Sequence, residues 1–163
     1  MTTRGEFTRK FDREILGDDS AAAEERAHLA KLQEAEQAAL ELEFTKLLQV
    51  LEYRAAWLRE RFPGMREPKL ESARGRRFEF GPSPMDKGRT VGWLEFRTRL
   101  TDSQQAVLLE SLMELEGQFS KRHDYVTFPK EKVSIDKAKR FVESKILEFA
   151  GTYQDVYGGT QTG

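Results

Sequence analysis

The sequence predicts an α+β protein: a long N-terminal helix, then a small three-stranded sheet covered by helices, two-layer, in the order α-β-β-α-β-α. Three observations lead to this prediction. No Pro precedes Pro63 and no Gly lies between Gly17 and Gly64, so nothing interrupts a helix across that window. Short segments after Pro63 alternate apolar and polar residues, which is typical of half-buried strands. Later segments repeat apolar residues at helical spacing.

The long helix is predicted over residues 20–62. Asp19 or Ser20 serves as its N-cap, and Pro63 with Gly64 ends it. Apolar residues in its second half recur at a period close to 3.6, namely Leu40, Phe44, Leu47, Leu51, Ala55, Leu58 and Phe62. We therefore expect residues 40–62 to pack on the core, whereas residues 20–38 project or contact another chain.

The second part of the chain supplies the sheet. Residues 76–80 (RRFEF) and 90–100 (TVGWLEFRTRL) alternate as strands do, and the Gly- and Pro-containing segment 81–89 predicts a long hairpin loop between them. Gly92 is a candidate β-bulge. Residues 124–128 (DYVTF) predict the third strand, which ends at Pro129.

Two further helices are predicted. Thr101 and Gln104 stand at the spacing of a capping box, which predicts a helix over residues 101–119. Ser134 begins a second amphipathic segment that extends toward Tyr157. The predicted organisation is a 1–19 N-terminal extension with a short amphipathic segment, a 20–62 helix whose first half projects, a 63–157 α+β domain packed on the second half of that helix, and a 158–163 flexible tail.

Composition argues against several kinds of chemistry. The chain has no Cys, which excludes disulfides, thiol nucleophiles and zinc–thiolate sites. Its two histidines, His28 and His123, are interpreted as surface or structural residues, and the carboxylates of Glu110, Glu114 and Glu116 as a solvated helix face. No HExxH, Walker A, GxSxG or GxGxxG motif occurs. We expect no enzyme, no metal, no cofactor and no small-molecule substrate, and, without an apolar leader or membrane span, a cytoplasmic protein.

Positive charge is concentrated in the predicted hairpin. The net charge of the chain is −1. Residues 63–100, however, contain nine basic and five acidic side chains, a net charge of +4. Basic and aromatic side chains on one strand suit stacking on bases with phosphate contacts nearby. The candidate nucleic-acid-binding residues are Arg74, Arg76, Arg77, Lys87, Arg89, Trp93, Arg97 and Arg99. The alternative is a charged sheet face with ordinary cross-strand ion pairs.

The N-terminal part of the chain predicts a protein partner. Phe7, Phe11 and Ile15 form an apolar stripe at a spacing of four, and Leu29 and Leu32 are the large apolar residues in the first half of the long helix. We expect a non-enzymatic interaction or assembly subunit that acts through these five residues. Its partner would be another protein or, in a homodimer, a second copy paired as a parallel or antiparallel coiled coil. The alternatives are a nucleic-acid accessory protein that uses the basic hairpin, and a chaperone-like module.

Overall fold

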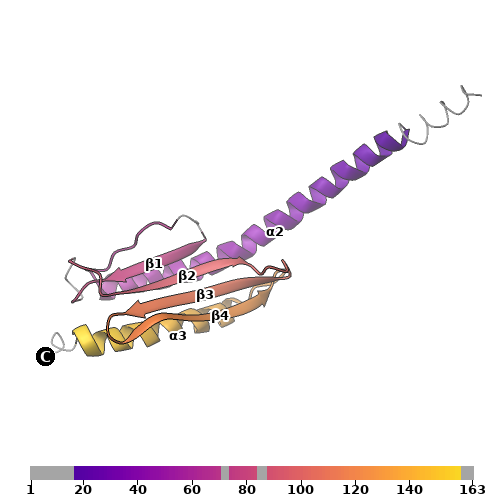
Figure 1. Ribbon diagram of the computed structural model, residues 1–163. Coiled ribbons are helices and arrows are strands. Elements are labelled where there is room, and N and C mark those ends of the chain that lie inside the picture. The colour runs from indigo at the N-terminus through magenta and orange to yellow at the C-terminus, as the bar shows by residue number, and fades with distance from the viewer. Residues whose placement is uncertain (1–16, 71–73, 84–87, 159–163) are drawn as a thin grey trace, which may run out of the picture. The chain divides into compact units, whose positions relative to one another are not determined.

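A computed structural model describes residues 17–70, 74–83 and 88–158 of the chain (Figure 1). The elements, in chain order, are α2 (Gly17–Arg61), β1 (Gly75–Phe80), β2 (Gly92–Leu100), β3 (Ala106–Leu115), β4 (Phe119–Pro129), α3 (Ile135–Tyr153) and a π-helical turn, η2 (Gln154–Gly158). The protein is therefore α+β, as predicted. Within the described residues, no helix is both long enough and apolar enough to cross a bilayer.

The chain forms two units, residues 1–40 and residues 41–163. In the first unit, the described residues 17–40 are α-helical, and the side chains of residues 20–39 are exposed except that of Ala22, which is half-buried. Ala, Glu, Lys and Gln dominate this segment and are strong helix formers. In the second unit, α2 continues from Glu41 to Arg61 and carries a buried apolar stripe. The predicted helix boundaries, 20–62, agree with the observed ones to within three residues.

The sheet is a four-stranded antiparallel meander in the order β1-β2-β3-β4 (Figure 1). Phe78 lies opposite Leu94, and Leu94 lies opposite Met113, so one face of the three strands is continuously apolar. Gly92 pairs with strands on both sides and is not a bulge. The register shift lies instead between Met113 and Leu115. An added Cβ at Gly92 would lie 2.6 Å from Cδ1 of Leu115, so Gly is needed there for close packing.

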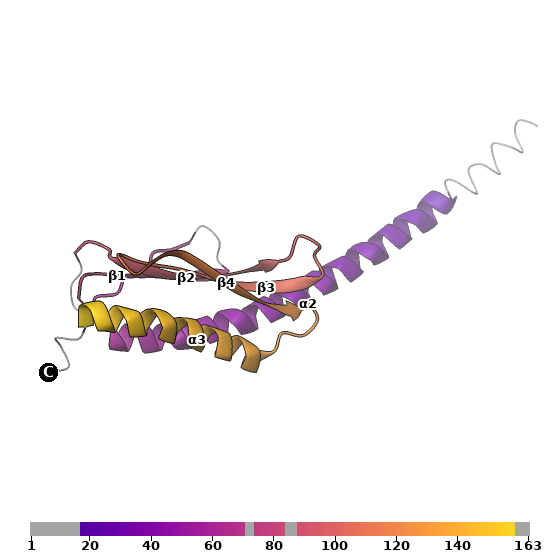
Figure 2. The ribbon, with the colours of Figure 1, turned by 60° about the horizontal axis from the view of Figure 1, so that its bottom comes forward.

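In the second unit, α2 and α3 lie together on one face of the sheet (Figure 2). The core between these two layers contains an aromatic cluster in which the ring of Phe80 lies 5.4 Å from Phe62, 4.7 Å from Phe149 and 5.2 Å from Tyr153. Tyr153 is fully buried, and its hydroxyl donates to the carbonyl of Gly81 at 2.8 Å. The fold thus has two layers, and the second face of the sheet carries charged side chains.

Both edges of the sheet have partners for some of their backbone groups. Beside β1, the backbone of Arg66 exchanges hydrogen bonds with that of Glu79 at 2.9 and 2.8 Å. On β4, Asp124 accepts a hydrogen bond from the next backbone N–H, and the carbonyl of Thr127 accepts one from Lys137 of α3. Such contacts protect an edge against pairing with another strand.

The predicted helix over residues 101–119 is wrong. Residues 106–115 form β3, so the sheet has four strands rather than three and the order is α-β-β-β-β-α. Thr101 and Gln104 form a tight turn and not a helix cap: the N–H of Gln104 donates to the carbonyl of Thr101 at 2.8 Å, and Gln104 has a φ of 59°. Residues 124–128 are a strand as predicted, but they belong to the longer β4. Ser134 does cap α3, accepting from the N–H of Lys137 at 3.2 Å.

Candidate binding surfaces

The helical segment of the first unit exposes the two predicted leucines. Leu29 is 49% exposed and Leu32 is 47% exposed, and both lie in the described part of α2. Their neighbours are alanines and polar or charged residues, so the segment has few other large apolar side chains to bury. The other predicted partner-binding residues, Phe7, Phe11 and Ile15, lie outside the described residues.

Two arginines of the hairpin connect β1 to α2. Arg74 pairs with Glu41, and Arg76 pairs with Glu52. Glu52 also accepts from Arg59 at 3.1 Å, and the two arginines hold its pKa below the usual value, the hydrogen bond from Arg59 being the largest cause. The positive charge at this end of the hairpin is therefore balanced by helix carboxylates.

Trp93 and two further arginines surround a buried carboxylate on the charged face of the sheet. Glu95 of β2 is only 2% exposed, and it accepts hydrogen bonds from Arg77 at 3.2 Å and from Arg97. The guanidinium of Arg77 also lies 4.3 Å from the centre of the Trp93 ring and donates to Glu79. Trp93 and Arg77 therefore stack on each other, in a position where the nucleic-acid hypothesis would place a base.

The last strands continue the same pattern. Arg99 donates to Glu110 at 2.6 Å, and His123 lies 3.0 Å from the second oxygen of the same carboxylate. Burial of Glu110 raises its pKa, but the hydrogen bonds from Arg99 and His123 outweigh burial, so the net pKa is lowered. His123 and Asp124 point to opposite faces, since Asp124 pairs with Lys145 of α3 at 2.5 Å. The carboxylate of Asp124 therefore does not orient the His123 ring. Glu110 lies on strand β3 rather than on the helix that was predicted.

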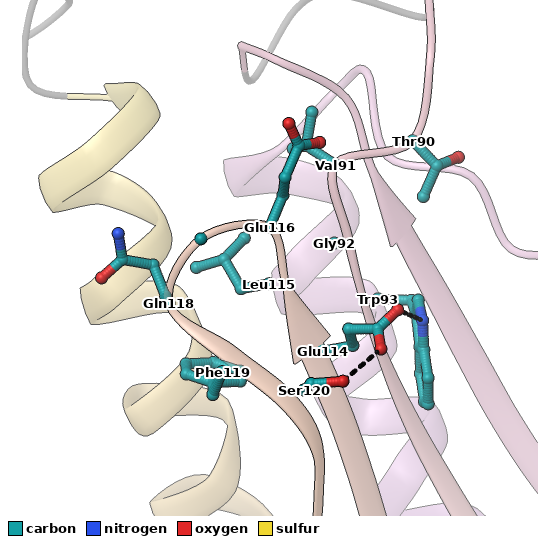
Figure 3. A pocket seen from close by; sticks show the side chains of 11 residues that line it. Thr90, Val91, Gly92, Trp93, Glu114, Leu115, Glu116, Gln118, Phe119 and Ser120 are labelled. Atoms are coloured by element: carbon teal, nitrogen blue, oxygen red, sulfur yellow. Dashed lines mark hydrogen bonds between the residues drawn. The ribbon is translucent and has the colours of Figure 1, made fainter.

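A cleft opens where β2 begins and β3 turns into β4 (Figure 3). It has a volume of about 480 Å³. Glu114, on its wall, accepts from the indole N–H of Trp93 at 3.2 Å and from the hydroxyl of Ser120 at 3.0 Å (Figure 3). At the rim, Glu116 pairs with Arg89 at 2.6 Å. The acidic groups of the cleft are thus engaged with side chains of the protein.

The described arginines of the basic hairpin are paired with carboxylates. Every described arginine of the predicted nucleic-acid-binding set has a carboxylate partner. Lys87, the remaining basic member, lies outside the described residues. Among the described residues, no group of three or more His, Asp or Glu side chains is arranged to hold a metal ion. The structure favours cross-strand ion pairing on this face, and whether the hairpin also binds nucleic acid stays a prediction.

The outer surface of the helix layer carries an exposed apolar groove that the sequence analysis missed. Tyr53 and Leu147 are each 66% exposed. Trp57 and Leu147 line a groove of about 200 Å³ between α2 and α3, together with Arg54 and its ion-pair partner Glu143. Trp, Tyr and Arg are the residue types that contribute most to protein interfaces.

Comparisons with known proteins add no assignment. No family model, no curated protein and no solved structure matches the chain. Function must therefore be inferred from the surfaces described above.

Proposed function

We propose that the protein is a non-enzymatic assembly protein that binds its protein partner, a second copy of this chain, through helix α2. One observation carries this proposal: Leu29 and Leu32 are each about half exposed on a helical segment in which, from residue 20 to residue 39, only Ala22 is even half-buried. The segment has the composition of a helix and gains almost nothing from packing within its own chain.

A partner would supply what this segment lacks. Helices in proteins are stabilised mainly by burying an apolar face, and isolated helices are marginal in water. Complete burial of a leucine contributes about 1.5–3 kcal/mol, so covering the exposed half of each of these two would add about 1 kcal/mol apiece. Partner binding would therefore stabilise the helix and bury the leucines in one step.

The charged face of the sheet is compatible with an assembly role because its charged side chains are paired with one another. Its arginines and glutamates pair with one another, and Trp93 stacks under Arg77 at 4.3 Å. These pairs stabilise the sheet without exposing an uncompensated charge. In this proposal the sheet contributes to the stability of the fold, and the exposed segment of α2 with Leu29 and Leu32 binds the partner.

The test is the mass of the protein in solution. We expect light scattering after size exclusion to give at least twice the 18.8 kDa of one chain, and the Leu29→Asp/Leu32→Asp variant to elute at the mass of one chain. Ala23→Asp/Ala27→Asp is the matched control: it adds the same two charges to the same helix, but roughly 120–180° away around its axis at about 100° per residue. The control should keep the mass of the unmodified protein.

Two results would contradict the proposal. One is an unmodified protein that has the mass of a single chain. The other is a Leu29→Asp/Leu32→Asp variant that keeps the larger mass. Tryptophan fluorescence of Trp57 and Trp93 reports on the second unit in each variant, so a loss of assembly can be separated from a loss of fold.

The second candidate function is nucleic-acid binding by the β1–β2 hairpin. It is favoured by the exposure of Arg97 and Arg99, whose side chains are 57% and 52% exposed although both are paired. Phosphate contacts would make the affinity fall steeply with salt. Arg97→Glu/Arg99→Glu should abolish binding to single-stranded DNA, and an unchanged affinity would contradict this candidate.

A further inference from the structure

An exposed stripe with a coiled-coil repeat runs along α2. Alternating steps of four and three residues lead from Ala21 through Leu32, Leu42 and Tyr53 to Glu60. Seven of these twelve positions are Ala, Leu or Tyr, and all twelve are exposed except Lys46, which is half-exposed. The period of 3.5 residues is that of a left-handed coiled coil. This stripe is distinct from the buried stripe of period near 3.6 that packs on the sheet.

The geometry points to an antiparallel pairing of α2 with α2 of a second copy of this chain, over residues 21–60. This inference rests on the proposed function and adds the orientation and register of the pairing. The steps of four and three read the same from either end of the stripe. In an antiparallel pair, let two residues face each other when their residue numbers add to 81. Every one of the twelve positions then faces another position of the stripe. Ala39 then faces Leu42 of the second copy, and His28 faces Tyr53 of the second copy.

Charge selects the antiparallel orientation. Residues 17–40 contain six acidic and two basic side chains, a net charge of −4, whereas residues 41–61 contain four of each. A parallel pair would place the two acidic segments side by side, which is unfavourable. An antiparallel pair places each acidic segment beside the neutral half of the other helix.

The positions on one flank of the stripe are complementary in charge in the same register. On one side, Glu24 comes beside Arg59 of the second copy, and Lys31 comes beside Glu52 of the second copy. Flanking pairs of opposite charge are the usual determinants of orientation in coiled coils. Because the axis is two-fold, each of these pairs forms twice.

The other flank carries Leu29, Val50 and Trp57 toward its ends and Glu36 and Glu43, which face each other in this register, in its middle; its apolar part meets the groove of the helix layer. Leu29 lies on the same side of α2 as Val50 and Trp57, which follow it by three and four repeats of seven residues. In the antiparallel pair, Leu29 of the second copy falls between these two residues, over the groove that Trp57 lines with Leu147. The partner helix would thus cover the apolar groove as well as the stripe.

The stripe favours a second copy of this chain as its partner. Self-complementarity in the repeat and in the charged flank favours a second copy over an unrelated helix, because an isologous interface presents the same patch from both subunits.

The absence of Cys from the chain allows a direct test by site-specific cross-linking. Leu32→Cys and Gln49→Cys, whose positions sum to 81, are prepared separately, then mixed, unfolded and refolded together. A short bis-maleimide should cross-link the mixture but neither variant alone, because like positions 32 lie about 25 Å apart along the antiparallel axis, at about 1.5 Å per residue. Ala30→Cys mixed with Gln49→Cys is the control, since position 30 points away from the stripe and should give no product.

The outcomes separate this inference from the proposed function. Cross-linking of Leu32→Cys with itself, or no product in the mixture, would overturn the antiparallel register. If the Leu29→Asp/Leu32→Asp variant is still reduced to one chain in that case, the assembly role of α2 stands and only the orientation fails. A product of equal yield in the Ala30→Cys control would also overturn the register. Light scattering of each Cys variant first establishes that it keeps the mass of the unmodified protein.

Discussion

Replacement of Glu95 by Gln should weaken the sheet measurably. Glu95 is 2% exposed and accepts from Arg77 and Arg97. The Gln side chain has nearly the same shape, so the substitution removes the negative charge without opening a cavity. Arg77 and Arg97 then donate to a neutral amide oxygen instead of a carboxylate.

The magnitude follows from the exposure of each arginine. Hydrogen bonds to charged groups contribute about 1.5–3 kcal/mol when buried, and exposed ion pairs about 0.2–1 kcal/mol. The Arg97 side chain is 57% exposed, so water can replace much of its lost contact. The Arg77 side chain is only 25% exposed, but it keeps its hydrogen bond to Glu79 at 3.0 Å. We therefore expect a loss of about 1–2 kcal/mol in the free energy of unfolding, less than for a fully buried pair.

Urea unfolding followed by tryptophan fluorescence measures this loss. A change of about 1–2 kcal/mol should lower the urea midpoint by about 0.5–1 M at a slope of about 2 kcal/mol/M, the middle of the usual range. Glu116→Gln is the control, because Glu116 pairs with Arg89 where both side chains are more than half exposed, and it should change stability by less than about 0.5 kcal/mol. Equal losses in the two variants would refute the reasoning that burial of Glu95 makes its ion pairs contribute more to the free energy of unfolding than an exposed pair does.

Two other predictions concern stability. Tyr153→Phe removes the hydroxyl that donates to the buried carbonyl of Gly81 and should cost about 1–2 kcal/mol in urea unfolding, whereas Tyr125→Phe at an exposed position should be nearly neutral; equal costs would contradict this. The pKa of Glu110 in the folded protein is below its ordinary 4.5, so its contribution to stability is complete above about pH 4.5 and is lost as the pH falls through the folded pKa. In the Glu110→Gln variant, the free energy of unfolding should therefore decrease less between about pH 5 and pH 3 than in the unmodified protein. An equal decrease in both proteins would show that the pKa of Glu110 is not lowered by Arg99.

Much of the helical part of the fold follows from sequence alone. The window without Pro or Gly between Gly17 and Pro63 leaves a helix as the favoured local structure, and the Ser134 cap marks the start of α3. These features depend on residues close together in the chain, so local preferences are sufficient to predict them. The β1 and β2 strands were also predicted, because their period of two is unambiguous.

The candidate surfaces were predicted in part. Exposure of Leu29 and Leu32 was expected from the polar residues around them. The pairing of each described hairpin arginine with a carboxylate was not, because partners such as Glu41 and Glu52 lie on α2 and are brought to the hairpin only by folding. The groove beside Trp57 was missed for the same reason, since its second wall, at Leu147, comes from α3.

The identity of residues 106–115 was decided by tertiary structure. This segment carries two overlapping patterns: Val107, Leu109 and Met113 fit a strand, whereas Leu108 and Leu112 fit a helix face. Local sequence permits both, and the helix interpretation was wrong. Pairing with β2 on one side and β4 on the other satisfies the backbone of the segment and buries its odd-numbered side chains under α2 and α3. The sequence by itself therefore determined where the long helices form. Only pairing with β2 and β4 determined that residues 106–115 are a strand, because β-sheet hydrogen bonds join residues that are distant in the chain.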